Sequence, residues 1–354
     1  MSPLKRLEVA GKSLAALLLA LLLGRPWRRR ALPPAPRRVL LVRTDARVGE
    51  ALLTTPLISA LRAQPSPPEV EVLVHAKVAR VLEELPGIAR VRVLGRNASL
   101  WSLRRERFEV VVDCGNWTAP SVHNAIYARL IAGRAPVLGP AAFPVGALHS
   151  HPVAPRADTA AEVAQRLHLL SPLLGAQVAD GPPGMSFRPP RPSQPGSELD
   201  ALLREIRPGT HAVVNPGGRL GWRRIDPATF AAASRALLAE GRVPIVTWGP
   251  GEEALAQEVI AASPGALLAP PTDLDGLALL MVRSGLTLCN NTGPMHLSVA
   301  LGVPTLAFFL HMDMARWGHA HAPHRMVDLT GPAQRGEPLG PLAAEAATTF
   351  ARGL

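Results

Sequence analysis

The stretch SGLTLCNNTGPMHLSVALGVPTLAFF, residues 284–309, decides the fold. It carries an apolar run, a polar loop, a helix-length run and a second apolar run, which predicts strand, loop, helix and strand in that order. The same order recurs twice upstream, in residues 211–241 and 243–263. Strands that alternate with helices form a parallel sheet whose ligands bind at the carboxyl ends of the strands. The carboxyl-terminal half is therefore predicted to be a Rossmann-like α/β domain.

The amino-terminal half repeats this pattern, beginning with RRVLLVRTDARVGEALLTTPLISALRA, residues 37–63. A buried strand is predicted over 39–42, followed by a polar loop and one amphipathic helix over 49–63. The other segments predicted in this half are strands over 70–76, 91–95 and 108–115 and a helix over 78–84. A second Rossmann-like domain follows from this order.

The predicted architecture is α/β, with two Rossmann-like domains that face each other across a ligand-binding cleft and an apolar leader helix at the amino terminus. The leader and its linker cover residues 1–37, and the amino-terminal domain covers 38–190. The carboxyl-terminal domain covers 191–335, after a Pro-rich connection over 181–195. A final helix over 336–354 is expected to pack back on the amino-terminal domain.

The basic charge of the chain is concentrated in the leader. Residues 1–38 carry nine basic residues and one acidic residue, a net charge of +8, which leaves +3 of the total +11 for the rest. A nearly neutral globular part argues against a nucleic-acid-binding protein. The two cysteines, Cys114 and Cys289, lack metal-site spacing and favour a reducing compartment.

The leader itself predicts contact with a membrane surface. The run LAALLLALLL, residues 14–23, is too short to span a bilayer. The following GRPWRRR places Trp27 and arginines where the lipid headgroups would lie, so residues 4–30 are expected to bind the inner face of the cytoplasmic membrane. A cleaved signal peptide and a helix that is solvated or docked on the core are the alternatives.

Two polar loops predict an anion site in the carboxyl-terminal domain. In NPGG, Asn215, Gly217 and Gly218 offer accessible backbone amides, and Arg223 and Arg224 follow closely. Amides and arginines together bind phosphate groups, although a Gly-rich strand exit can also be a tight turn alone.

The second polar loop follows the strand at 286–288. Thr292 and Gly293 lie where amides would point at an anion, and His296 is as compatible with a structural role as with ligand binding. Glu252 and Glu253 open another helix, and their carboxylates are interpreted as favourable charges at its amino terminus.

These segments resemble those of glycosyltransferase family 9, the ADP-heptose:lipopolysaccharide heptosyltransferases and their relatives. NNTGPMHLSVALGVPTLAFF is similar to the family signature D-T-G-x-x-H-x-A-A-A-x-G-x-P, and RTDARVGEALLTTPLISALR is similar to its opening R-x-D-x-x-G-D-x-x-x-T-P. NPGGRLGWRRIDPATF resembles its phosphate loop, so the three motifs run in family order. The resemblance implies a GT-B fold, no required metal, no cofactor, and inverting transfer of a sugar from a nucleotide-sugar, expected to be ADP-heptose, to a lipopolysaccharide-core or other lipid-linked glycan.

The resemblance also assigns residues. Glu50 matches the catalytic base, where the family has Asp, in an acceptor-side loop with Arg43, Asp45 and Gly49. A solvated carboxylate in the first turn of a helix is the alternative for Glu50. The residues that match the donor side are Asn215, Gly217, Gly218, Arg223, Arg224, Asn291, Thr292, Gly293 and His296.

Three departures from the family pattern leave alternatives open. Asn291 replaces an Asp, Glu50 is one methylene longer than Asp, and Leu310 to Met312 replace the usual G-x-T. A glycosyltransferase with another nucleotide-sugar donor, or a non-catalytic nucleotide-sugar-binding relative, would fit these changes. Four histidines close to the carboxyl terminus have HxH spacing without carboxylate or Cys partners, and we predict that they bind no metal. They are His311, His319, His321 and His324.

Overall fold

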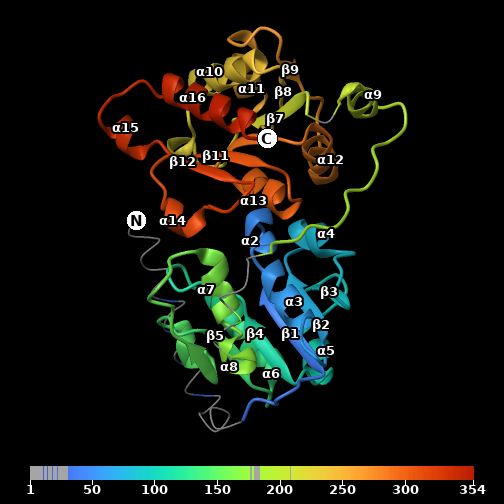
Figure 1. Ribbon diagram of the computed structural model, residues 1–354. Coiled ribbons are helices and arrows are strands. Elements are labelled where there is room, and N and C mark those ends of the chain that lie inside the picture. The colour runs from blue at the N-terminus through green and yellow to red at the C-terminus, as the bar shows by residue number, and fades with distance from the viewer. Residues whose placement is uncertain are drawn as a thin grey trace. The chain divides into compact units, whose positions relative to one another are not determined.

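The computed structural model describes residues 31–175, 184–207 and 209–354, and five single residues (Figure 1): Gly11, Leu14, Leu18, Leu22 and Val178. Apart from four of those positions, the segment 4–30 predicted to contact a membrane lies outside the described residues. No helix in the described part of the chain has both the length and the apolar character needed to cross a bilayer. The chain divides into two compact units, Met1–Arg188 and Pro189–Leu354.

The first unit is built on a parallel six-stranded sheet of order β3-β2-β1-β4-β5-β6. Its strands are β1 (Arg38–Arg43), β2 (Glu69–Val74), β3 (Arg90–Val93), β4 (Val110–Asp113), β5 (Val137–Pro140) and β6 (His151–Val153). Val39 to Val42 of β1 are fully buried, as the continuous apolar run predicts for a central parallel strand. β1 lies between β2 and β4.

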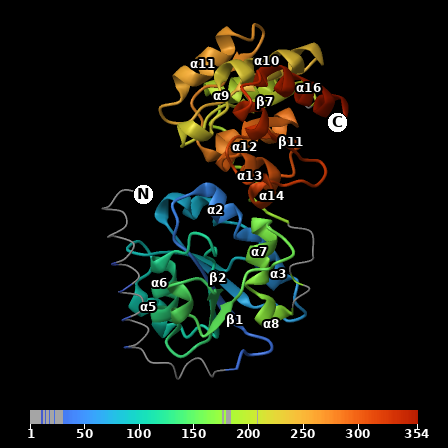
Figure 2. The same cartoon turned by 90° about the vertical axis from the view of Figure 1, so that its left-hand side faces the viewer.

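Helices cover both faces of this sheet, with α5 and α6 on one side and α3 and α7 on the other (Figure 2). The helices are α2 (Val48–Leu52), α3 (Thr55–Arg62), α4 (Ala79–Leu82), α5 (Leu100–Arg105), α6 (Val122–Ala132), α7 (Glu162–His168) and α8 (Ser171–Leu174). The single helix predicted over 49–63 is wrong, because the chain forms α2 and α3 separately. Pro56 lies in the first turn of α3, where it donates no N–H and would clash with the carbonyl of Leu52 in a continuous helix.

The second unit has a parallel sheet of order β12-β11-β10-β7-β8-β9. Its strands are β7 (His211–Asn215), β8 (Val243–Val246), β9 (Leu267–Leu268), β10 (Thr287–Asn290), β11 (Thr305–Phe309) and β12 (Arg325–Asp328). When the strands are numbered within each unit, both sheets have the order 3-2-1-4-5-6 of the Rossmann fold. The prediction of two parallel, Rossmann-like α/β domains is confirmed.

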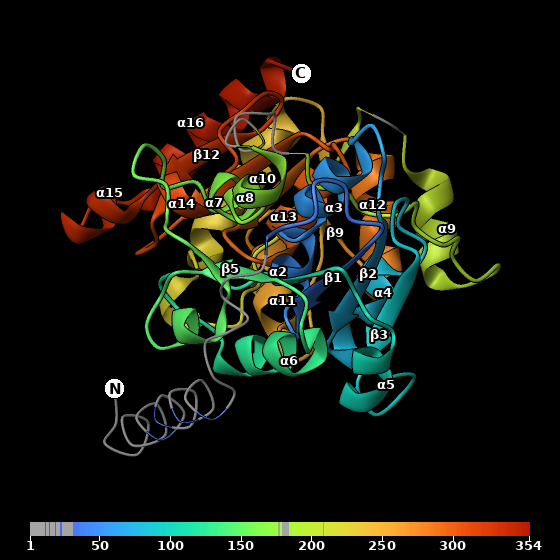
Figure 3. The same cartoon turned by 90° about the horizontal axis from the view of Figure 1, so that it is seen from below.

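The helices of the second unit are α9 (Glu198–Glu205), α10 (Pro227–Ala239), α11 (Glu253–Ala261), α12 (Leu274–Ser284), α13 (Gly293–Ala300), α14 (Met314–Trp317), α15 (Thr330–Gln334) and α16 (Leu339–Arg352). Figures 1 and 3 both show α9 beside α12. Phe230 of α10 meets Phe308 of β11 edge to face in the core, with ring centroids 5.9 Å apart.

The final helix packs within its own unit. Ala343, Ala346, Ala347 and Ala351 of α16 are buried in the same apolar cluster as Phe230 of α10. Small side chains let two helices approach closely, so this Ala face is satisfied by α10. Its described contact is with α10. The contact with the amino-terminal domain that the sequence predicts stays a prediction.

Candidate functional site

In each unit the strand order reverses between two neighbouring strands, β1 and β4 in the first and β7 and β10 in the second. Ligands of such sheets bind outside the carboxyl ends of the strands at this point. The residues predicted from sequence follow β1, β7 and β10. They form two groups, one in each unit.

The group in the first unit surrounds Glu50, which lies in α2 and is only 5% exposed. Its Oε2 accepts a hydrogen bond from Nη2 of Arg43 at 2.5 Å and another from Nη2 of Arg166. Oε1 lies 3.2 Å from Nη2 of Arg47. The carboxylate is therefore enclosed by three guanidinium groups.

This enclosure determines the charge of Glu50. Burial alone would raise the pKa of the carboxyl group, but the charges of Arg166, Arg43 and Arg47 outweigh burial and hold it well below its usual range. The carboxylate is thus ionised at every physiological pH. A solvated first-turn carboxylate, the alternative for this position, does not describe it.

The acceptor-side residues predicted with Glu50 lie beside it. Arg43 ends β1, and its Nη2 lies 3.1 Å from Oδ2 of Asp45, while Gly49 belongs to the short helix α2. Nη1 of Arg43 donates to the carbonyl of Cys114 after β4, so Arg43 joins the two strands at which the order reverses. The carboxylate of Asp45 is 24% exposed, more than that of Glu50.

Sequence reasoning missed Arg166 and Glu162 of α7. Arg166 is fully buried and donates from Nε to Glu162 at 2.9 Å and from Nη1 to the carbonyl of Glu50 at 3.1 Å. Their spacing of four residues could have indicated an ion pair on one helix face. Nothing local could have indicated Glu50 as a partner, because it precedes Arg166 by 116 residues.

A second buried pair lies at the end of β4. Nε2 of His149 is 3.0 Å from Oδ2 of Asp113, and both side chains are fully buried. Nδ1 of His149 faces the carbonyl of Pro140 at 3.2 Å, and the amide of Gly115 donates to Oδ1 of Asp113. Each ring nitrogen of His149 therefore has an oxygen partner, which fixes the orientation of the ring. Gly139 makes room for the ring, since a Cβ there would lie 2.5 Å from it.

In the second unit, the predicted phosphate loop holds a carboxylate of the chain itself. The amide of Gly218 donates to Oε1 of Glu252 at 2.8 Å, and the amide of Gly249 donates to Oε2 at 3.2 Å. A Cβ on Gly217 would collide with the same carboxylate. Glu252 therefore accepts the hydrogen bond of the Gly218 amide, which the sequence predicted to bind phosphate. A phosphate group at that amide would displace Glu252.

This contact corrects the interpretation of Glu252 as a carboxylate that stabilises the amino terminus of its own helix. Glu252 is the N-cap residue of α11, but its side chain makes no capping hydrogen bond there. It reaches instead to the loop after β7. Asn215, which ends β7, donates from Nδ2 to Oγ1 of Thr247 at 3.1 Å and so binds the neighbouring strand exit.

The basic residues of this loop include a buried donor, Nε of Arg223. The guanidinium of Arg223 lies over the ring of Trp222, 4.3 Å from its centroid. Burial, followed by the charge of Arg219, lowers the pKa of Arg223. Its Nε has no hydrogen-bond partner within the described ranges. The side chain of Arg224 lies against Gly218 and Gly221.

The loop after β10 contains the remaining predicted residues. Nδ2 of Asn290 donates to the carbonyl of Pro216 at 2.8 Å, which ties this loop to the loop after β7. Nδ2 of Asn291 is buried and, among the described residues, has no hydrogen-bond partner. Thr292 is the N-cap residue of α13 and makes no side-chain capping bond, and Gly293 is the first residue of the helix.

His296 is buried in the first turns of α13. It is 6% exposed, and its Nδ1 lies 2.9 Å from Nε2 of His319, a residue that sequence reasoning treated only as part of a weak metal pattern. Over the described residues, no group of three or more His, Cys, Asp or Glu side chains is arranged to hold a metal ion.

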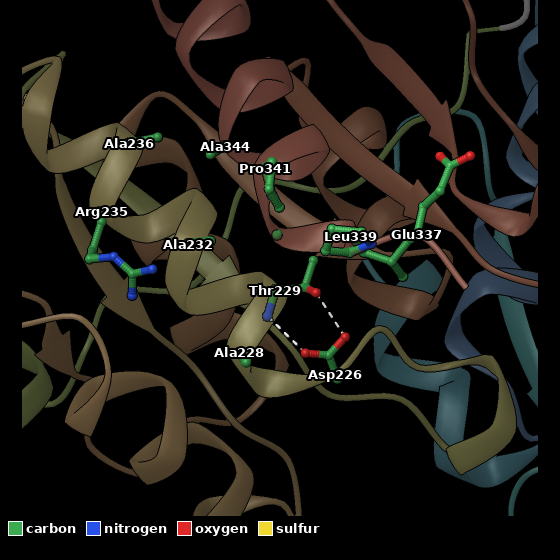
Figure 4. A pocket seen from close by; sticks show the side chains of 12 residues that line it. Asp226, Ala228, Thr229, Ala232, Arg235, Ala236, Glu337, Leu339, Pro341 and Ala344 are labelled. Carbon is green, nitrogen blue, oxygen red and sulfur yellow. Dashed lines mark hydrogen bonds between the residues drawn. The ribbon is translucent and has the colours of Figure 1, made fainter. Parts of the chain in front are cut away.

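A groove of about 840 Å³ lies between α10 and the start of α16 (Figure 4). It contains none of the predicted site residues. Its Asp226 accepts hydrogen bonds from both the amide and the hydroxyl of Thr229, so these side chains form a helix cap. The lining of the groove includes none of the buried ion pairs described above.

A match to a protein-family model shows to which family the chain belongs. The model of glycosyltransferase family 9 (heptosyltransferase) matches residues 102–334, about two thirds of the chain. The chain belongs to glycosyltransferase family 9. It is therefore a glycosyltransferase, and the family resemblance inferred from sequence is confirmed.

Known relatives agree with this family 9 assignment. Lipopolysaccharide heptosyltransferase 3 of Escherichia coli is 25% identical over 293 residues, which cover 76% of this chain and 82% of that protein. Among solved structures, a family 9 glycosyl transferase from Veillonella parvula superposes with a TM-score of 0.72 at 17% identity, covering 92% of this chain and 99% of the other.

Two further solved structures share the fold. ADP-heptose lipopolysaccharide heptosyltransferase II of E. coli superposes with a TM-score of 0.67 at 17% identity, over 89% of this chain and 99% of the other. An E. coli heptosyltransferase solved with ADP-2-deoxy-2-fluoro heptose superposes with a TM-score of 0.64 at 17% identity, again over 89% and 99%. These likenesses show the fold of this family 9 glycosyltransferase, which is GT-B as predicted.

Proposed function

We propose that this glycosyltransferase transfers heptose from ADP-heptose, with inversion, to a lipopolysaccharide-core or related lipid-linked glycan. One observation carries the donor side of the proposal. Asn291 Nδ2 and Arg223 Nε are buried donors without partners among the described residues, and they follow the strands β10 and β7. Buried donors require acceptors, and the oxygens of a nucleoside diphosphate sugar would supply them.

The relatives support the choice of substrates. The E. coli proteins include a lipopolysaccharide heptosyltransferase 3 and a heptosyltransferase solved with an ADP-heptose analogue. Asn291 replaces the usual Asp, so it would offer the donor a neutral amide in place of a charge. A different nucleotide-sugar donor is the alternative that this substitution favours.

In the proposed reaction the acceptor hydroxyl oxygen bonds to the anomeric carbon while the bond from that carbon to the diphosphate oxygen breaks. The hydroxyl proton passes to the carboxylate of Glu50, and the nucleoside diphosphate leaves. The low pKa of Glu50 is compatible with this role if the proton leaves late. Once the new bond forms, the protonated ether oxygen is a far stronger acid than the starting alcohol, so a weak base suffices.

The charge that develops on the leaving diphosphate would be stabilised by this chain's own groups. Arg223 and Arg224 supply cations, and the amides at Thr292 and Gly293 begin helix α13. With these groups, we propose that the reaction needs neither a metal nor a cofactor. Glu252 would leave the amide of Gly218 when phosphate oxygens bind there.

The proposed location is the cytoplasmic side of the membrane. Residues 1–38, with a charge of +8 and a ten-residue apolar run, would bind anionic lipid reversibly. Such binding would hold the enzyme beside an amphiphilic acceptor. Vesicle cosedimentation of the full chain and of a chain that begins at residue 38 tests this part separately.

The substrate proposal is tested with purified protein. Release of the matching nucleoside diphosphate is measured with ADP-heptose, a UDP-sugar and a GDP-sugar, each with and without lipopolysaccharide-core acceptor. Of the three donors, we expect only ADP-heptose to release its nucleotide, and only when the acceptor is present. We also expect ADP to stabilise the protein against thermal unfolding by about 2.7 kcal/mol at 100-fold excess over its dissociation constant. Turnover of a UDP- or GDP-sugar would change the donor, while nucleotide binding without any turnover would contradict the enzyme proposal.

A further inference from the structure

The loop after β7, residues 216–225, carries the groups that the donor proposal assigns to phosphate. They are the amide of Gly218 and the guanidinium groups of Arg223 and Arg224. A 3₁₀ turn forms at Gly221–Arg223, and the rest of the loop has no helix or strand of its own. Such a segment is ordered only where other groups hold it, because each free residue retains conformational entropy.

One side chain holds both ends of this loop. Oδ1 of Asn290 accepts a hydrogen bond from the amide of Ile225 at 3.1 Å. Its Nδ2 donates to the carbonyls of Pro216 at 2.8 Å and Gly217 at 3.2 Å. The side-chain amide of Asn290 therefore joins the first residues of the loop to its last residue.

These partners fix the orientation of the Asn290 amide. A backbone N–H only donates and a backbone carbonyl only accepts, so exchanging the oxygen and nitrogen of the side chain would break all three bonds. Asn290 is 1% exposed, so the bonds are shielded from water. Its main chain ends β10, which lies between β7 and β11, and the side chain is thus anchored in the middle of the sheet.

The last residue of the loop is also anchored by apolar packing. The side chain of Ile225 is 1% exposed and belongs to the core cluster that contains Phe230 of α10 and Phe308 of β11. Asp226 follows and caps α10 by accepting a hydrogen bond from the amide of Thr229. The loop therefore leaves the sheet and returns to the core at fixed points, and Asn290 joins the two.

The loop lies against the start of α13. A Cβ on Gly218 would lie 3.0 Å from Cγ2 of Thr292 and 3.2 Å from Cγ of Arg224. The backbone of Gly218 thus approaches both side chains more closely than a larger residue would allow without movement. The amide of Gly218, a guanidinium side chain and the first turn of α13 are brought together in this way.

We propose that Asn290 is a positioning residue for the donor's diphosphate, which acts by holding the loop 216–225 against the amino terminus of α13 before the donor binds. Without this side chain, the loop would become ordered only when phosphate binds, and the cost of ordering would lower the affinity. Asn290 does not itself touch the diphosphate, because its oxygen and nitrogen are both bonded to the loop. The proposal rests on the proposed donor site.

The experiment measures the binding of inorganic pyrophosphate and of ADP to the full chain by calorimetric titration. Pyrophosphate has neither a base nor a sugar, so its affinity reports on the phosphate-binding groups alone. Asn290→Leu keeps the volume of the side chain and removes its hydrogen bonds to the loop, and it should weaken the binding of both ligands about tenfold or more. A folded Asn290→Leu variant that binds pyrophosphate as tightly as the wild type would overturn the proposal.

A control variant separates positioning from stability. Thr305→Val also removes buried hydrogen bonds, because the hydroxyl of Thr305 is bonded to Oγ of Ser298 and to the carbonyl of Val303. Thr305 begins β11, at the amino ends of the strands, whereas the loop follows their carboxyl ends. This variant should lose stability but bind pyrophosphate within about twofold of the wild type. Equal weakening of pyrophosphate binding in both variants would overturn the positioning role.

A second readout needs neither a variant nor a ligand. The amide of Ile225 lies outside the helices and strands, and its bond to Asn290 should slow its hydrogen exchange in the free wild type by about 10² or more relative to an unstructured peptide. Exchange at the unstructured rate would overturn the role of Asn290 even if the protein transfers sugar. If neither pyrophosphate nor ADP binds, the donor proposal and the role toward diphosphate both fail, while the exchange of Ile225 still decides whether Asn290 holds the loop.

Discussion

The two units share one strand order but surround their strand exits with different chemistry. In the first unit, Glu50 is held by Arg43 and Arg166, and Asp113 is held by His149, all of them buried. The described contacts at the corresponding exits of the second unit join amides, hydroxyls and imidazoles, with Glu252 as the carboxylate among them. Charge in the first unit is balanced by the chain itself.

This difference matches the two substrates of a sugar transfer. An acceptor alcohol is neutral, so the unit that takes its proton must carry its own carboxylate and hold it charged. A nucleotide-sugar brings negative charge with it, so the unit that binds it needs donors that are not already paired with carboxylates. The following predictions test this division, from the largest expected effect to the smallest.

Asp113→Asn should cause the largest loss of stability. It removes the carboxylate partner of the fully buried His149, and breaking a buried pair costs about 3–5 kcal/mol. Urea unfolding at pH 7 measures the change, and Asp158→Asn, in an exposed ion pair with Arg156, is the control that should show no measurable loss. An unchanged midpoint for Asp113→Asn would mean that the carboxylate of Asp113 does not stabilise the buried pair.

Glu50→Gln should lower the rate of transfer by about 10² or more while ADP affinity stays the same. The matched control is Glu71→Gln. Glu71 is equally buried and bonded to Arg38 and Arg92, but it lies in β2, near the amino ends of the strands and away from the site. A similar loss of turnover in both folded variants would show that Glu50 acts only through stability.

The same variant changes the pH dependence of stability. The folded-state pKa of Glu50 is lowered, so its contribution is complete above the unfolded value of about 4.3 and is lost as pH falls toward the folded value. The Glu50→Gln variant should therefore lose less stability than the wild type as the pH falls below about 5. The unfolding free energies of the wild type and of Glu50→Gln are measured at pH 7, 5, 4 and 3. Equal losses of stability below pH 5 in the two proteins would mean that the three arginines do not act on Glu50.

Arg223→Met should weaken ADP binding about tenfold or more, because a charge-assisted hydrogen bond to phosphate contributes about 1.5–3 kcal/mol. Arg235→Met, on the outer face of α10, is the control and should bind ADP normally. Calorimetric titration measures both. Equal affinities for the two variants would remove Arg223 from the donor site.

Gly217→Ala should have the smallest effect, a loss of about 1 kcal/mol, because the new Cβ displaces the flexible side chain of Glu252. Gly184→Ala is the control, since nothing lies within 4 Å of a Cβ there. Thermal unfolding distinguishes them. A Gly217→Ala variant as stable as the control would mean that Glu252 does not occupy the loop in solution.

Continuous apolar runs made the central strands easy to predict, whereas β5, β6, β9 and β12 were not predicted. The run at 39–42 is found inside β1, because a strand buried on both faces needs apolar residues at every position. The single helix over 49–63 was predicted incorrectly because its apolar spacing continues through Pro56, which ends one helix and begins another. The family motifs located the loops correctly at the strand exits.

The contacts within the site were largely beyond prediction. Arg166 and Glu50 are 116 residues apart, and Gly218 and Glu252 are 34 apart, so neither pair leaves a local pattern. The packing of α16 on α10 depends on a complementary helix surface, which an Ala-rich sequence alone does not identify. Sequence therefore predicted which residues are chemically active, and the fold determined their partners.

The division of charge between the units is tested most directly by calorimetric titration of ADP into the wild type, Glu50→Gln and Arg223→Met. We predict that Glu50→Gln binds ADP as tightly as the wild type does, and that Arg223→Met binds it about tenfold or more weakly. Equal weakening in both variants, or in neither, would contradict the account.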